Sequence, residues 1–179
     1  MAPTIPVHLV PYDPAWPAIA AHHMTQLRAM EGLFVATHHI GSTSVPGLTA
    51  KPVVDLIGIV SDLALLEARR ADMEALGYVW HGAFGVEDRR FFTWDGPETG
   101  QRVINLHCYE THSPNAALQL AFRNYLRAFP EVAADYAQEK QRAMRLFPDN
   151  STLYAEEKGP FIRATLEKAK AWVGETQPG

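Results

Sequence analysis

Residues 40–55 have the sequence IGSTSVPGLTAKPVVD, a loop of small residues followed by the start of an apolar strand. Such a loop can turn its backbone N–H groups and hydroxyls toward a phosphate, and we assign Gly41, Ser42, Ser44 and Lys51 to that role. An acid on the next strand, Asp55, can then hold a metal ion beside the phosphate. The stretch predicts a nucleotide or phosphate site, with a tight glycine–proline turn that exposes its serines as the alternative.

Asp55 lies inside the run Val53–Val60, which otherwise predicts a strand buried on both faces. A lone carboxylate is costly there unless a metal, a cation or hydrogen-bond donors satisfy it. A structural salt bridge to Arg89 or Arg90 is the alternative to a functional role. Other phosphate motifs are absent from the sequence: the loop lacks Walker A spacing, and no Gly-x-Gly-x-x-Gly occurs.

The segments around this stretch alternate between helix and strand. Apolar spacing predicts helices over 16–30 and 63–76, and β-branched and aromatic residues predict strands over 33–40, 53–60, 78–80, 91–94 and 102–109. From residue 113 onward, apolar stripes predict two or three helices. We therefore expect an α/β core over residues 1–112, with C-terminal helices over 113–175 packed on it as one compact unit and a loose tail from Thr176.

Composition indicates one globular domain of 179 residues, 47% hydrophobic and 20% charged. The 16 Lys and Arg residues against 20 Asp and Glu residues give a net charge of −4, which disfavours binding to nucleic acid or anionic membranes. A single cysteine, Cys108, excludes an internal disulfide framework and a multi-cysteine zinc site. The first Lys or Arg is Arg28, and no apolar run is long enough to span a bilayer, so we expect a cytoplasmic protein.

A second candidate site residue comes from strand alternation. Ile104, Leu106 and Cys108 form an apolar face of the strand, which leaves Asn105 and His107 on the other. If that polar face meets Asp55, then His107 completes a catalytic pair, either as a metal ligand or as a general base. The alternative for His107 is a core histidine that orients Asp55, and for Cys108 we expect packing.

Basic side chains recur later in the chain. Arg89 and Arg90 lie on a glycine-flanked loop, where guanidinium groups can clamp a phosphate or carboxylate. Arg123 and Arg127 are one helical turn apart, as are Tyr136 and Lys140. For Arg127 we expect a solvated helix face.

The chain resembles the GrpB family, also called UPF0157. The resemblance is carried by residues 40–55, by FGVEDRRFF at 84–92, by NLH at 105–107 and by FRNYLR at 122–127, and it extends from residue 7 to the last helix. It implies the nucleotidyltransferase superfold, an α/β arrangement of a small mixed sheet with flanking helices and a C-terminal helical extension. It also implies that Arg123, Lys140 and Lys158 contribute to ligand binding.

The superfold's catalytic pattern needs Gly-Ser, two acids separated by one apolar residue on a strand, and a third acid on a neighbouring strand. Two metal ions bridged by these acids activate the nucleophile. Here Gly41-Ser42 and Asp55 fit, whereas Ile57 stands at the second acid and His107 is the candidate for the third.

The resemblance thus implies an enzyme that binds a nucleotide or phosphorylated small molecule with Mg²⁺ at Asp55 and transfers a nucleotidyl or related group to a small acceptor. Two alternatives stay open. The first is a degenerate binder without transferase activity, which Ile57 favours; the second is a hydrolase with one metal ion held by Asp55 and His107.

Overall fold

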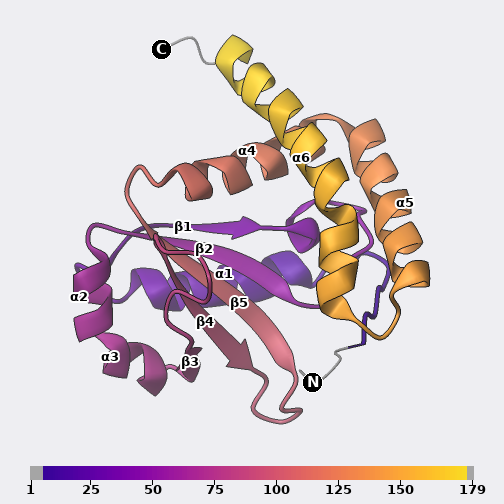
Figure 1. Cartoon of the computed structure of the whole chain (residues 1–179). Coiled ribbons are helices and arrows are strands. Elements are labelled where there is room, and N and C mark those ends of the chain that lie inside the picture. Colours follow the sequence, from indigo (N-terminus) through magenta and orange to yellow (C-terminus); the bar gives the residue numbers. More distant parts are fainter. Residues whose placement is uncertain (1–5, 177–179) are drawn as a thin grey trace.

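A five-stranded mixed sheet forms the centre of the protein (Figure 1), described for residues 6–176 in a computed structural model. Its strand order is β1-β2-β5-β4-β3. The central pair β2 and β5 is parallel, and every other neighbouring pair is antiparallel. The strands are β1 (Phe34–Ile40), β2 (Val54–Val60), β3 (Tyr78–Trp80), β4 (Arg89–Asp95) and β5 (Arg102–Glu110).

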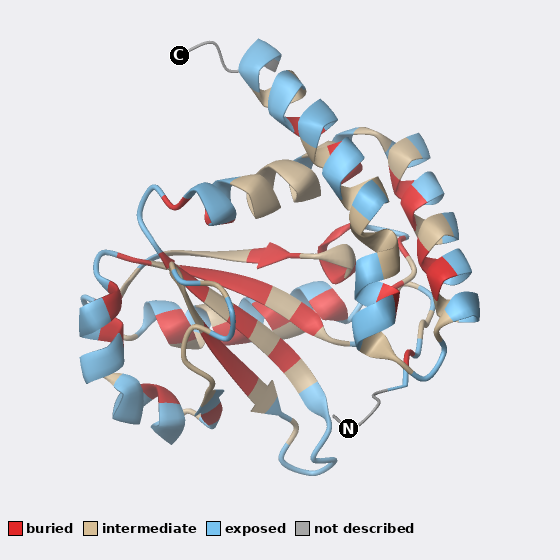
Figure 2. Cartoon of the chain, viewed as in Figure 1, coloured by how far each residue is buried: buried red, intermediate tan, exposed pale blue. Residues whose placement is uncertain are grey.

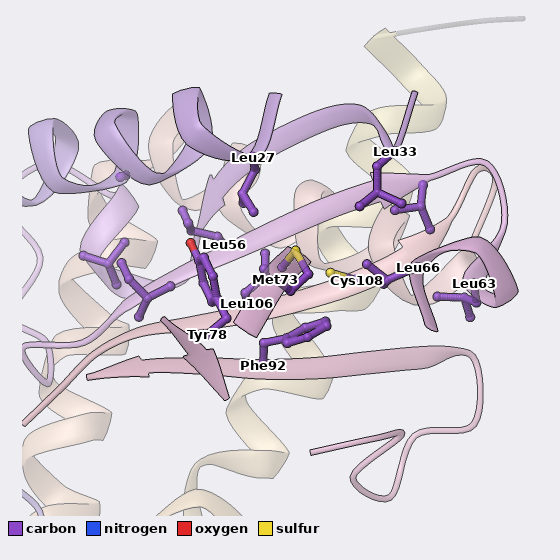
Figure 3. Close-up of a cluster of buried hydrophobic side chains, with 14 of the residues drawn as sticks. Leu27, Leu33, Leu56, Leu63, Leu66, Met73, Tyr78, Phe92, Leu106 and Cys108 are labelled. Carbon is purple, nitrogen blue, oxygen red and sulfur yellow. The ribbon is translucent and has the colours of Figure 1, made fainter. Parts of the chain in front are cut away.

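One face of the sheet packs against the first three helices. Alternate residues of the central strands, such as Leu56, Leu106 and Cys108, meet apolar side chains of those helices, such as Leu27 and Leu66 (Figure 3). Burial raises the pKa of the Cys108 thiol, as expected for a packing residue. The helices are α1 (Trp16–Arg28), α2 (Leu63–Ala68) and α3 (Arg70–Ala75).

The opposite face of the sheet lies under the C-terminal helices (Figures 1 and 2). It carries Asp55, Asn105 and His107, the polar positions predicted from strand alternation. Ile40, Ile57 and Tyr109 pack there against Ala116 of α4. The three helices are α4 (Pro114–Ala128), α5 (Pro130–Leu146) and α6 (Ser151–Thr176). No helix in the described part of the chain is both long and apolar enough to cross a membrane.

Helix boundaries differ from the sequence predictions at three places. The helix predicted over 63–76 is two helices that meet at Arg69, which leaves helical geometry and donates to the Glu31 carbonyl and the Asp72 carboxylate. The first helix ends at Arg28 rather than at residue 30. Thr176 of the predicted tail belongs to α6, and the rest of that tail, 177–179, lies outside the described residues.

Candidate functional site

The loop after β1 is held by its own hydrogen bonds. Gly41 has φ 71° and ψ −174°, a conformation that essentially only glycine adopts. A short 3₁₀ turn, Ser42–Ser44, follows, and the Ser44 hydroxyl donates to the Gly41 carbonyl at 2.6 Å. Arg127 donates from Nε to the Ser44 carbonyl at 2.9 Å. These hydrogen bonds fasten the loop to itself and to α4, and Arg127, which is exposed as expected, supplies the bond from α4.

Asp55 lies on the sheet face below this loop. Register pairs Asp55 with Asn105 and Ile57 with His107 across the parallel strands, so all four share one face. Asn105 donates from Nδ2 to Asp55 Oδ1 at 3.0 Å, and His107 Nε2 lies 3.7 Å from the same oxygen. Strand alternation thus placed Asp55 and His107 together as expected, and an amide donor rather than Arg89 or Arg90 satisfies the carboxylate.

Arg89 fixes the tautomer of His107. Its guanidinium donates to His107 Nδ1 at 3.3 Å and to the Phe84 carbonyl at 2.6 Å, and it lies 5.1 Å from the Phe91 ring centroid. A guanidinium only donates hydrogen bonds, so Nδ1 accepts and the proton is on Nε2, toward Asp55. His107 is therefore arranged to donate a hydrogen bond at the site, and metal binding through Nε2 would require the other tautomer.

Replacing Arg89 by methionine is expected to release this tautomer preference, because Nδ1 loses its donor. Imidazole ¹⁵N NMR should show His107 protonated on Nε2 in the unmodified protein and a mixture of tautomers in the variant. Arg90→Met is the matched control, since Arg90 points to the opposite sheet face and pairs with Glu67. A His107 ring that is already protonated on Nδ1 in the unmodified protein would contradict the assignment.

A cavity of about 260 Å³ opens between the loop, the sheet and the helices α5 and α6, and we call it the lysine cavity. Lys51, Lys140 and Lys158 line it together with one carboxylate, Asp55. Within the described residues, none of these lysines has an acidic side chain within ion-pair distance. The other lining residues are Gly41, Ser42, Thr43, Ala50, Val53, Asn105, Phe122, Tyr136 and Tyr154.

Lys140 and Lys158 make cation–π contacts with tyrosine rings instead of ion pairs with carboxylates. Lys140 Nζ lies 4.9 Å from the Tyr136 ring centroid and donates to the Thr49 carbonyl; Lys158 Nζ lies 4.1 Å from the Tyr154 ring centroid. Burial, with help from the neighbouring Lys158 charge, lowers the pKa of Lys140 to about 7. Burial and the Lys51 charge lower the pKa of Lys158 to about 8. The cavity thus gathers three lysine side chains and a single carboxylate, Asp55.

The structure brings part of the predicted set to this cavity. Gly41, Ser42, Lys51, Asp55, Lys140 and Lys158 line it. Ser44 does not, because its buried hydroxyl is used within the loop. Arg89 and Arg90 belong to β4 rather than to the predicted glycine-flanked loop; Arg89 does not line the cavity, and Arg90 lies on the opposite face of the sheet. Arg123 donates to the His39 carbonyl and to Asn124 instead of reaching the cavity.

Two residues of the candidate site, Asn105 and Tyr154, were not predicted from the sequence. Asn105 was recognised only as a neighbour of His107, although it is the donor to Asp55. Tyr154 was not singled out, although it repeats on α6 the spacing of Tyr136 and Lys140 on α5: each tyrosine precedes its lysine by four residues. Because residues at that spacing share one helix face, the repeated Tyr-x-x-x-Lys pattern was the available signal.

The donor set does not fit a two-metal centre. Ile57, at the second acid's position, is 0% exposed and packs with Ile40 and Tyr109. In residues 6–176, no three or more His, Cys, Asp or Glu side chains converge on one point. Mg²⁺ bound by Asp55 alone, with ligand phosphates supplying further oxygens, is chemically reasonable, and the Mg²⁺ assignment stays a prediction.

The sheet and its helices have the nucleotidyltransferase fold. The structure of the Cid1 poly(U) polymerase H336N mutant bound to MgATP aligns over 73% of this chain and 45% of that chain, with a TM-score of 0.51 and 10% identity. That likeness concerns the fold alone, and it confirms the predicted fold class.

The GrpB protein family model matches residues 6–168, so the chain belongs to the GrpB family, as its sequence motifs indicated. The structure of GrpB from Enterococcus faecalis aligns over 92% of this chain and 99% of that chain, with a TM-score of 0.83 and 32% identity. The UPF0157 protein YqkA of Bacillus subtilis is 33% identical over 167 residues, 93% of this chain. This chain spans about half of YqkA, 48% of its length.

Proposed function

We propose that the lysine cavity binds a nucleotide or another phosphorylated small molecule. The observation that carries the proposal is the convergence of three lysines, one of them only 2% exposed, on a cavity that supplies no partner anion except Asp55. Placing an ammonium group in such surroundings is unfavourable unless a ligand compensates it. A phosphate group offers the charge and the acceptor oxygens that do so.

The loop adds directional donors to this charge. Ser42 lines the cavity, so its hydroxyl can donate to a phosphate oxygen that approaches the lysines. In a two-metal transferase, metal ions neutralise the phosphates. In this chain the lysines supply that charge, which favours binding of the phosphate without a metal pair.

Nucleotidyl transfer is the second candidate, and the position of Asp55 favours it. The carboxylate is held by Asn105 at the edge of the lysine cavity, where a single Mg²⁺ shared with ligand phosphates would sit. Pyrophosphate release from a nucleoside triphosphate that stops with Asp55→Asn would support transfer. Firm ligand binding without release, across a range of acceptors, supports the binding role.

Thermal unfolding with a panel of ligands tests the proposal. A ligand that binds only the folded state raises the melting temperature by mass action, so pyrophosphate and nucleoside triphosphates should raise it, with or without Mg²⁺. Ser42→Ala should reduce the shift because it removes a donor from the cavity. Ser44→Ala is the control: it weakens the loop but should keep the shift. A panel that leaves every melting curve unmoved overturns the proposal.

A further inference from the structure

A second cavity of about 260 Å³ adjoins the first on the same face of the sheet, and we call it the apolar cavity. Its apolar walls come from β1, α4 and α6: Ile40, Leu118, Phe122, Ile162 and Leu166. Its polar lining is Asp55, His107 and Gln119, and Gly41 lines it as well.

The two cavities meet at a common wall. Gly41, Asp55 and Phe122 line both, so the two cavities lie on either side of these residues, and a ligand that fills both would extend past Asp55. The Gln119 amide donates to the Tyr109 hydroxyl at 2.8 Å and is already engaged. The polar side chains of the apolar cavity that can face a ligand are therefore Asp55, at the shared wall, and His107, whose Nε2 proton is directed toward Asp55.

His107 and Asp55 do not form a hydrogen bond with each other. Their closest atoms are 3.7 Å apart, beyond the range of a normal hydrogen bond, so the Nε2–H group can donate to an oxygen placed at the junction. The far end of the apolar cavity has hydrocarbon walls. A nucleobase there would leave its polar edge without partners, which is unfavourable, whereas a hydrocarbon group would gain by burial.

We propose that the ligand is a phosphate monoester of an apolar alcohol, with its phosphate in the lysine cavity, its ester oxygen at His107 and its hydrocarbon group in the apolar cavity. This rests on the proposed function and narrows it, because it prefers a hydrocarbon over a nucleobase. His107 acts on this ligand as a positioning donor.

Titrations with hexyl phosphate, inorganic phosphate, AMP and hexanol test the proposal. Hexyl phosphate is expected to bind about tenfold or more tightly than inorganic phosphate, since its chain is buried, whereas AMP should show no such gain. In methyl-labelled protein, hexyl phosphate and hexanol should both shift the methyl NMR signals of Ile162 and Leu166. Inorganic phosphate should shift these signals much less.

Leu166→Asn should abolish the gain of hexyl phosphate over inorganic phosphate and leave inorganic phosphate affinity unchanged. Leu153→Asn is the matched control, because Leu153 is an exposed leucine of the same helix and lines neither cavity. If the Leu166 variant does not fold, the proposal is tested by whether hexyl phosphate shifts the methyl signals of Ile162 and Leu166 in the unmodified protein.

The possible failures are distinguishable. If hexyl phosphate and hexanol leave the methyl signals unmoved, this inference is overturned whether or not phosphate binds. If AMP gains as much as hexyl phosphate, the preference for a hydrocarbon is overturned. If inorganic phosphate does not bind but hexanol shifts the methyl signals, the proposed function fails and the apolar cavity stands as a binding site.

Discussion

Replacing Gly41 by alanine is expected to lower the free energy of unfolding by about 2–3 kcal/mol and to remove phosphate binding. Two causes combine. The backbone has φ 71° and ψ −174°, which alanine adopts only with strain. A Cβ atom there would also lie 2.6 Å from Asp55 Oδ2, so the carboxylate must move out of its place beside Asn105. Urea unfolding and pyrophosphate titration measure the two effects.

Gly47→Ala is the matched control for this substitution. Gly47 also has a positive φ, 78°, but a Cβ atom added there would meet nothing within 4 Å, so we expect strain alone, about 1–2 kcal/mol. In an Asp55→Ala background the extra cost of Gly41→Ala should shrink, because the collision with Oδ2 is gone and only the 3.2 Å contact with Cβ remains. Equal costs for the two glycine substitutions, with phosphate binding retained, would contradict the packing of Gly41 against Asp55.

Replacing Lys140 by methionine is expected to weaken pyrophosphate binding roughly ten- to a hundredfold, since a hydrogen bond to a charged group contributes about 1.5–3 kcal/mol. Methionine keeps the apolar length of the side chain beside the Tyr136 ring and removes the ammonium. Lys168→Met on α6 is the control, because Lys168 is exposed and lines neither cavity. Calorimetric titration measures the affinities, and equal affinities in the two variants would contradict the role of Lys140.

Lys140 and Lys158 should make the affinity for an anion depend on pH. Lys140 has a pKa lowered to about 7 and Lys158 a pKa lowered to about 8, so both are charged near pH 6 and largely neutral near pH 9 in the free protein. Since an anion binds the charged form, affinity should fall as the pH rises through this window, with protons taken up on binding. Sulfate is a suitable probe because its own charge is constant there, and Lys140→Met should flatten the lower part of the profile.

The alternation of side chains along a strand depends only on local backbone geometry. It therefore predicted which face of the sheet carries Asp55 and His107. Asp55 and His107 were placed on one face from the spacing of their own strands, and parallel register then brought them together. The loop was also predictable, since few sequences other than a run of small residues make such a turn. What alternation could not give is the partner of each polar atom, and so Asn105 was undervalued as the donor to Asp55.

The hydrogen-bond and ion-pair partners of the arginine side chains could not be predicted from the sequence. Arg89 and Arg90 are neighbours, yet successive strand residues face opposite sides, so one contacts His107 and the other contacts Glu67. On α4, Arg123 and Arg127 are both used by backbone carbonyls that only the folded chain places within reach. Long side chains can reach several partners, and tertiary packing chooses among them.

The most direct test is a calorimetric titration of pyrophosphate into chelator-treated protein near pH 6, where both lowered lysine pKa values leave the ammonium groups charged. We expect saturable binding at one site, with an affinity that added Mg²⁺ changes little, because lysines neutralise the phosphate. Binding that is absent in chelator and restored by Mg²⁺ would contradict it, since metal ions would then hold the ligand.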